Sequence, residues 1–98
     1  MREPLYVWIT TRKLKPGTYE QFSRAWRPDE IPEGMLQAFE YYAAELNEVV
    51  GLSIWDSHES REAYRLSDVE SRRRQAMAPY VVHEHSGFYV GRQLRLPR

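Results

Sequence analysis

The spacing of apolar positions in the first part of the chain predicts a β-strand followed by a helix. Residues 5–12 carry aliphatic side chains at positions 5, 7 and 9 and aromatic side chains or threonine at positions 6, 8 and 10. A period of two is typical of a strand, and bulky groups on both sides indicate that both faces are covered. After Pro16-Gly17 the spacing becomes helical from Thr18, with aromatic residues at 19, 22 and 26 on one stripe. Arg27-Pro28 ends this helix, because the residue before a proline avoids helical dihedral angles.

The next two apolar segments predict a β-hairpin. After a proline-rich loop we expect strands from Met35 to Ala43 and from Glu48 to Trp55, with Leu46-Asn47 in the short connection. Positions 50, 52 and 54 of the later strand hold valine, leucine and isoleucine, which form one aliphatic face. We expect this face to pack against helices.

Capping signals predict a second helical region in two pieces. A capping box, in which an acceptor side chain precedes a glutamate by three residues, begins at Asp56 and again at Ser67. A helix therefore starts near Asp56, breaks near Leu66-Ser67, and resumes as a later piece that ends near Ala78. Alternation of period two returns from Gly87 to Leu96, which predicts the fourth strand.

The predicted order is strand, helix, strand, strand, helix, strand. With right-handed crossovers this order predicts a ferredoxin-like β-α-β-β-α-β fold of the α+β class, in which both helices cover one face of a four-stranded antiparallel sheet. We expect residues 1–98 to form this single domain. The other sheet face would carry large side chains, among them Tyr6, Trp8 and Trp55. Because an open apolar face is a liability in a monomer, we expect a homodimer in which two such faces pack together.

Composition excludes several classes of function. The 98 residues contain 14 basic and 14 acidic side chains, so the formal net charge is zero and a nucleic-acid partner is not expected. Cysteine is absent, which excludes disulfides, thiolate metal sites and a cysteine nucleophile. The first residues, Met1-Arg2-Glu3-Pro4, precede no apolar signal core, and no apolar run is long enough to span a membrane. We therefore expect a cytoplasmic protein without a membrane partner.

Several short motifs identify a resemblance that covers nearly the whole chain. They are Pro16-Gly17 before the first helix, Pro32-Glu33-Gly34-Met35 at the second strand, and Leu52-Ser53-Ile54-Trp55-Asp56-Ser57 leading into Glu62-Ala63-Tyr64, with Ser67-Asp68 starting the later helical piece. In these motifs the chain resembles the dimeric α+β barrel superfamily and, within it, the antibiotic-biosynthesis-monooxygenase-like domains. The resemblance implies homodimers whose sheets close a barrel, with a ligand pocket in each subunit between helices and sheet.

The activities of that superfamily differ, and the resemblance separates them. Some members oxidise polyphenols or quinols with molecular oxygen and use no metal or organic cofactor, whereas others degrade haem. The haem-degrading branch carries an asparagine in the first strand, a tryptophan in the second helix and a histidine further along. The matching positions here hold Thr10 or Thr11, Tyr64 and Arg74, so the resemblance does not imply haem degradation.

Two histidines and one arginine are the candidate catalytic residues. His83 and His85 flank Glu84, and in an extended segment both imidazoles point to the same face, where they could shuttle protons. Two histidines alone do not make a metal site, because a third ligand is needed. The alternative is that they lie in an exposed connection before the fourth strand. Arg72 to Arg74 fan around a helix as a solvated face, but the resemblance places Arg74 at a pocket position that suits an anionic or phenolate group.

Other side chains are candidate substrate contacts. Tyr64, Trp26 and Phe22 either form core or line a slot for a flat aromatic ligand. Thr11 and Arg12 of the first strand are expected at the same site. No phosphate loop or G-x-G-x-x-G segment is present, so a nucleotide cofactor is not expected.

Two functions from different classes fit these features. The first is a cofactor-independent monooxygenase-like enzyme that acts on a small aromatic or quinol-type molecule, without metal or organic cofactor. In this hypothesis His83 or His85 is the base, Arg74 binds the anion, and Tyr64 and Trp26 are walls. The second is a non-catalytic small-ligand-binding or accessory protein, since no clear acid–base pair is present. The two are distinguished by whether the space between helices and sheet is open and polar-lined or is filled by Phe22, Trp26 and Tyr64.

Overall fold

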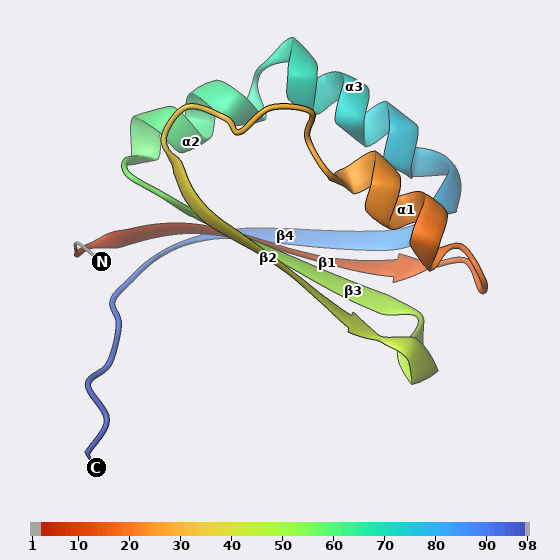
Figure 1. The fold of residues 1–98 in the computed structure, drawn as a ribbon, viewed down its shortest axis with the longest axis horizontal. Coiled ribbons are helices and arrows are strands. Elements are labelled where there is room, and N and C mark those ends of the chain that lie inside the picture. Colours follow the sequence, from red (N-terminus) through yellow and green to blue (C-terminus); the bar gives the residue numbers. More distant parts are fainter. Residues whose placement is uncertain (1–2, 98) are drawn as a thin grey trace.

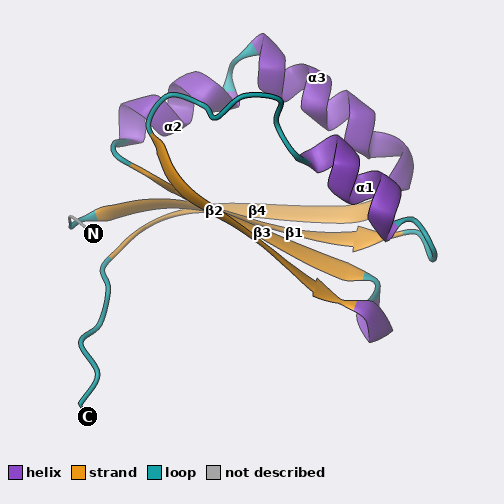
Figure 2. Ribbon diagram, in the orientation of Figure 1, coloured by secondary structure: helices purple, strands orange, loops and turns teal. Residues whose placement is uncertain are grey.

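A computed structural model describes the chain from residue 3 to residue 97. One layer of helices covers one face of a single sheet (Figures 1 and 2). The elements are β1 (Leu5–Leu14), α1 (Tyr19–Trp26), β2 (Met35–Ala43), β3 (Glu48–Trp55), α2 (His58–Arg65), α3 (Asp68–Met77) and β4 (Val81–Gly91). The four strands run in the order β2-β3-β1-β4, and every neighbouring pair is antiparallel. The predicted ferredoxin-like α+β fold is confirmed.

The helix starts follow local capping chemistry. Ser57 caps α2, where its side chain accepts a hydrogen bond from the backbone N–H of Ser60, and Ser67 caps α3 in the same way through Glu70. The predicted break between the two helical pieces is therefore confirmed. The predicted cap at Asp56 is wrong by one residue, because Ser57 supplies the capping acceptor. The backbone N–H of Asp56 donates to the carbonyl of Gly34 at 2.8 Å. None of the helices between residues 3 and 97 has the length and apolarity needed to cross a bilayer.

The fourth strand lies earlier in the chain than the alternation from Gly87 to Leu96 predicted. β4 pairs with β1 along its whole length, from Leu14 opposite Val81 to Leu5 opposite Gly91. Because β1 begins at Leu5, residues 92–97 have no partner strand within the described part of the chain. They instead extend away from the body, on the side of the sheet opposite the helices (Figure 1).

The assignment of the two sheet faces is the reverse of the prediction. Trp8 and Trp55 are buried with Tyr64 of α2 in one core cluster, so they lie on the helix-covered face and not on the open one. The strand register puts Ile9 opposite Leu52 and one residue out of phase with Trp8. The aliphatic positions of β1 and β3 therefore form the open face, together with the exposed rings of Phe39, Tyr41 and Tyr89.

A second core cluster lies at the other end of the helix layer. Phe22 of α1 is completely buried against Leu14, Val49 and Met77. The two clusters hold the helices above the sheet at two separate places, and a cavity lies between them.

Candidate functional site

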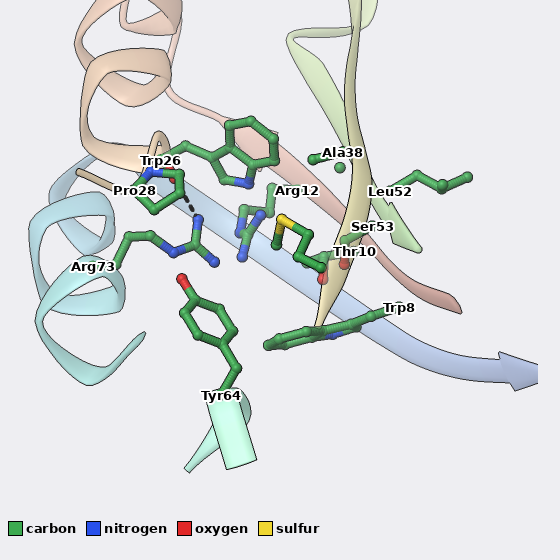
Figure 3. Close-up of a pocket in the computed structure, with 12 residues that line it drawn as sticks. Trp8, Thr10, Arg12, Trp26, Pro28, Ala38, Leu52, Ser53, Tyr64 and Arg73 are labelled. Atoms are coloured by element: carbon green, nitrogen blue, oxygen red, sulfur yellow. Dashed lines mark hydrogen bonds between the residues drawn. The ribbon is translucent and has the colours of Figure 1, made fainter. Parts of the chain in front are cut away.

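A cavity of about 80 Å³ lies between the helices and the sheet, in the gap between the two core clusters (Figure 3). Successive inward positions of β1 form its floor, and α1, α2, α3 and the loop before β2 supply its walls. The residues that line it are Trp8, Thr10, Arg12, Trp26, Pro28, Met35, Ala38, Gly51, Leu52, Ser53, Tyr64 and Arg73.

Trp26 reaches the sheet because Gly51 has no side chain. A Cβ at Gly51 would lie 3.2 Å from the indole ring of Trp26, which is closer than ordinary van der Waals contact. On its other side Trp26 is held by Arg73, whose Nη1 donates to the Trp26 carbonyl at 2.6 Å and whose guanidinium lies 5.8 Å from the ring centre. The indole is thus a fixed flat wall.

Tyr64 forms the facing wall. Its ring meets Trp8 edge-on at 6.4 Å between centroids and lies 5.4 Å from Trp55. Figure 3 shows its hydroxyl directed toward Arg73. Burial raises the pKa of Tyr64, and the nearby Arg73 opposes this only in part, so the hydroxyl is neutral at physiological pH.

Arg12 brings a buried positive charge to the cavity. The residue is 3% exposed, and its Nε and Nη2 both contact Oε1 of Glu84 at 3.0 Å. Among residues 3–97 its Nη1 has no hydrogen-bond partner. Burial lowers the pKa of Arg12, with the charge of Glu84 acting against burial and that of Arg73 adding to it. A buried donor without a partner costs about 1–3 kcal/mol, so the protein retains this group at an energetic expense.

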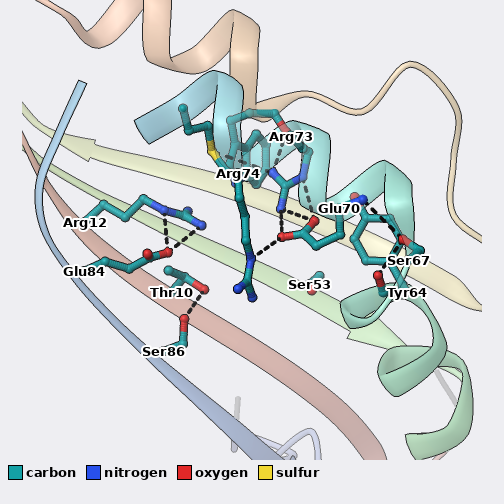
Figure 4. Close-up of polar contacts among 12 residues, drawn as sticks. Thr10, Arg12, Ser53, Tyr64, Ser67, Glu70, Arg73, Arg74, Glu84 and Ser86 are labelled. Atoms are coloured by element: carbon teal, nitrogen blue, oxygen red, sulfur yellow. Dashed lines mark hydrogen bonds and ion pairs between the residues drawn. The ribbon is translucent and has the colours of Figure 1, made fainter. Parts of the chain in front are cut away.

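A buried carboxylate behind the wall orders the other arginines (Figure 4). Glu70 accepts from Nε and Nη2 of Arg73 at 2.9 and 3.0 Å, and from Nε of Arg74 at 3.2 Å. The Glu70 side chain is 1% exposed, and such burial requires pairing of this kind. Because Glu70 binds Arg73 through both carboxylate oxygens, the position of the Arg73 guanidinium beside the cavity is fixed.

The structure brings three of the predicted contacts together and separates others. Tyr64, Trp26 and Arg12 line the cavity. Phe22 does not, because its ring is buried in the neighbouring core cluster, with the Arg12 guanidinium 5.6 Å above it. Arg74 also lies outside the cavity. Its half-exposed side chain borders a second space of about 200 Å³, beyond Arg12, and its guanidinium lies 6.0 Å from the Trp8 ring.

His83, His85 and Thr11 lie on the opposite side of the sheet. In the register, Thr11 is opposite His85, whereas Arg12 is opposite Glu84 and turns toward the cavity. The two histidines are part of β4 and not of a loop, and their imidazoles do share one face. That face is the open one, so neither imidazole reaches the cavity of its own chain.

Sequence reasoning missed much of the lining. Trp8, Thr10 and Arg12 are alternate residues of one strand, so their common face was visible in the sequence once one of them was assigned to the site. Arg73 and Ser53 gave no such signal, because their positions depend on how α3 and β3 pack. Within residues 3–97 no group of three histidine or acidic side chains is arranged to hold a metal ion.

Comparison with known proteins agrees with this description at the level of the fold. No protein-family model matches the sequence, and no curated protein matches it significantly. Solved structures do match: a candidate antibiotic biosynthesis monooxygenase from Caulobacter crescentus (13% identity, 92% of each chain, TM-score 0.79) and another from Nitrosomonas europaea (16%, 93% of each chain, TM-score 0.78). SnoaB, a cofactor-independent oxygenase from Streptomyces nogalater, matches at 15% identity over 97% of this chain and 99% of its own, with a TM-score of 0.77. The resemblance to the antibiotic-biosynthesis-monooxygenase-like domains is therefore confirmed as a shared ferredoxin-like α+β fold.

Proposed function

We propose that this protein is a cofactor-independent monooxygenase-like enzyme that oxidises a small aromatic or quinol-type molecule in the cavity between helices and sheet. The observation that carries the proposal is the composition of the cavity, with flat walls from Trp26 and Tyr64 and positive charge from Arg12 and Arg73. The similarity in fold to SnoaB, which is a cofactor-independent oxygenase, supports the reaction type.

The lining suits a reaction through an electron-rich anion. Removal of a proton from a phenolic or quinol-type substrate gives an anion that can transfer electrons to oxygen, and a positively charged, water-poor site favours that anion. In the keto tautomer of such a phenol the ring carbon that is oxidised is a CH₂ group, and there one atom of O₂ becomes the product carbonyl while the other leaves as water with both hydrogens. The substrate thus supplies all the electrons. Because His83 and His85 face away, the proton passes to water in this scheme.

The size of the cavity bears on how a substrate enters. Its volume is about 80 Å³, whereas an apolar cavity that holds benzene measures roughly 150 Å³. A groove of about 470 Å³ lies on the other side of Tyr64, bordered by the loop at Ile31-Pro32 and by Ala63 and Val69. Tyr64 borders both spaces, and we expect a ligand of two or three rings to use both.

Oxygen uptake tests the proposal. A panel of dihydroxynaphthalenes and related phenols is added to the protein in an oxygen electrode, with heat-denatured protein as the control. We expect uptake for at least one compound, a loss of at least tenfold in Trp26→Ala, and unchanged rates in His83→Ala and His85→Ala. Absence of uptake for the whole panel would reject the enzyme.

A non-catalytic ligand-binding or accessory role is the second candidate. It is favoured by the absence of a histidine or carboxylate among the lining residues of the described chain, which leaves no side chain suited to act as a base. This role predicts that a bound aromatic raises the melting temperature without being converted. Turnover of any such ligand would exclude it.

The proposal includes a homodimer that forms through the open sheet face. This face combines the aliphatic positions of β1 and β3 with exposed aromatic rings, including Tyr41 at 54% and Tyr89 at 51%. The tail after Gly91 carries exposed Leu94 and Leu96 and projects to the same side. Sedimentation equilibrium should give twice the monomer mass of 11.7 kDa.

A charge placed on each face tests this interface. Ile9→Arg, on the open face, should return the sedimentation mass toward that of the monomer, whereas Leu66→Arg, on the exposed helix side, should leave it unchanged. A monomer mass for the unaltered protein at micromolar concentration contradicts the dimer.

A further inference from the structure

The hydrogen bonds of Arg12 leave one end of its guanidinium free. An arginine side chain carries five N–H donors in a planar fork. In Arg12 the Nε and Nη2 groups are directed at Glu84, while Nη1 has no partner in the described part of the chain although the residue is 3% exposed. Water therefore does not replace the missing acceptor in the way it does for a surface arginine, and a buried donor of this kind fits an acceptor that arrives with a ligand.

The group of ion pairs beside the cavity carries an excess of one positive charge. Three guanidinium groups, from Arg12, Arg73 and Arg74, share two carboxylates, from Glu70 and Glu84. Both carboxylates lie behind or beside the wall, and the charged residues that line the cavity itself are Arg12 and Arg73. A single negative charge in the cavity would balance the group.

The two lining arginines also act on one another. Figure 3 shows their guanidinium groups close together between Trp26 and Tyr64, and the charge of Arg73 lowers the pKa of Arg12 in addition to the effect of burial. Like charges in a poorly solvated space repel more strongly than in water. An anion beside Arg12 reduces this repulsion and supplies the missing acceptor at once.

The walls set the shape of that anion. Trp26 and Tyr64 present flat rings, and Trp8 contributes a third ring at the floor. We infer that the cavity binds its ligand as an aromatic monoanion, a carboxylate or a phenolate, whose charged oxygen accepts hydrogen bonds from Nη1 of Arg12. This inference rests on the proposed function for the aromatic character of the ligand. It adds that the ligand is negatively charged and that Arg12 binds the charged oxygen.

Glu84 is the positioning residue of this site. It holds Arg12 by the Nε and Nη2 side of the fork, so the Nη1 side faces the anion. The Glu84 side chain is 44% exposed, which means that water can solvate it when a substitution removes its partner. Replacing Arg12 therefore does not bury an unpaired carboxylate.

Matched acid and amide ligands test the charge. Isothermal titration compares benzoate with benzamide, and 2-naphthoate with 2-naphthamide, at neutral pH. A hydrogen bond between charged groups in a buried site corresponds to about 10-fold to 100-fold in affinity. We expect each acid to bind more tightly than its amide by this factor, and Arg12→Gln to remove the preference. Arg72→Gln is the matched control, because Arg72 is an exposed arginine of the same helix that lines neither space and does not belong to this group of ion pairs, and it should keep the preference.

A chromophoric phenol tests whether the cavity binds a phenolate as well as a carboxylate. 4-Nitrophenol ionises near neutral pH, and its phenolate absorbs in the visible. Binding to the unaltered protein should lower the pH at which the bound phenol ionises, and Arg12→Gln should abolish this shift. A result with the carboxylates alone restricts the ligand to carboxylic acids, and a result with nitrophenol alone restricts it to phenols.

The outcomes separate this inference from the proposed function. Equal binding of acids and amides, together with an unshifted nitrophenol titration, overturns the inference even where oxygen uptake is found. A clear acid preference that depends on Arg12, with no oxygen uptake for any phenol, supports the inference and rejects the enzyme. Circular dichroism checks the fold of Arg12→Gln, and where that variant fails to fold, the acid–amide comparison on the unaltered protein decides alone.

Discussion

Replacement of Glu70 by glutamine tests whether a buried carboxylate holds α3 in place above the cavity. The substitution keeps the shape of the side chain and removes its charge. Glu70 is 1% exposed and accepts hydrogen bonds from Arg73 and Arg74. After the change, water can solvate Arg74, which is 50% exposed, but has little access to Arg73, which is 11% exposed.

The expected loss is therefore that of one buried ion pair. Removal of one partner from a buried pair costs about 3–5 kcal/mol, and the lower end applies here because Arg73 keeps its hydrogen bond to the Trp26 carbonyl. A domain of this length unfolds with a free energy of about 5–15 kcal/mol. Glu70→Gln should consequently stay folded in buffer but lose a large part of its stability.

Urea unfolding followed by tryptophan fluorescence measures this loss. The protein concentration is held constant, because assembly contributes to apparent stability. Glu62→Gln is the matched control, since Glu62 pairs with Arg65 at the same i,i+3 spacing but both side chains are about one-third exposed. We expect a much lower midpoint for Glu70→Gln and almost no change for Glu62→Gln. Equal shifts in the two variants would refute the role of burial.

Four further predictions concern the core, the turns, a helix cap and pH. Phe22→Ala removes a fully buried ring and should lower the unfolding free energy by about 3–5 kcal/mol in urea. Gly34→Ala should lower the melting temperature more than Gly17→Ala: both glycines have positive φ, but of the two only Gly34 would bring its Cβ into a clash, with the side chain of Ser60. Ser67→Ala removes the acceptor at the start of α3 and should cost about 1 kcal/mol in the urea experiment. Burial raises the pKa of Tyr64, so the stability it provides is complete below the unfolded-state value of about 10 and is lost as pH rises through the folded-state pKa. Tyr64→Phe should reduce the fall of the urea midpoint in that alkaline range, and an unchanged fall contradicts this assignment.

Local signals in the sequence predicted the order of elements and most of their limits. The hairpin strands Met35–Ala43 and Glu48–Trp55 agree with prediction, because alternation and a short polar connection are properties of neighbouring residues. The limits of β4 could not be predicted in this way. They depend on where β1 offers backbone partners, and the alternating segment that continues to Leu96 passes beyond the end of β1.

The site was predicted less well than the fold because its residues come together through packing. Arg74 and Arg73 are neighbours in sequence, and only the contact of Glu70 with both of them places Arg73 at the cavity and Arg74 outside it. For His83 and His85 the local geometry was predicted correctly, but their side of the sheet was not. Their shared face followed from strand geometry, but the side of the sheet to which that face belongs was decided by the pairing of Glu84 with Arg12.

The assignment of the two sheet faces explains why both proposals are needed. Strand alternation identifies two faces but not which one the helices cover, and burial of aliphatic side chains is the usual guide. In β1 the helices cover Trp8, Thr10 and Arg12, while Val7 and Ile9 lie on the open face. A sheet that served only as core would gain more by the reverse arrangement, since a buried guanidinium with a free donor is costly. The observed arrangement is stable if the covered face contains a ligand site that uses this donor, and if a second copy covers the aliphatic face.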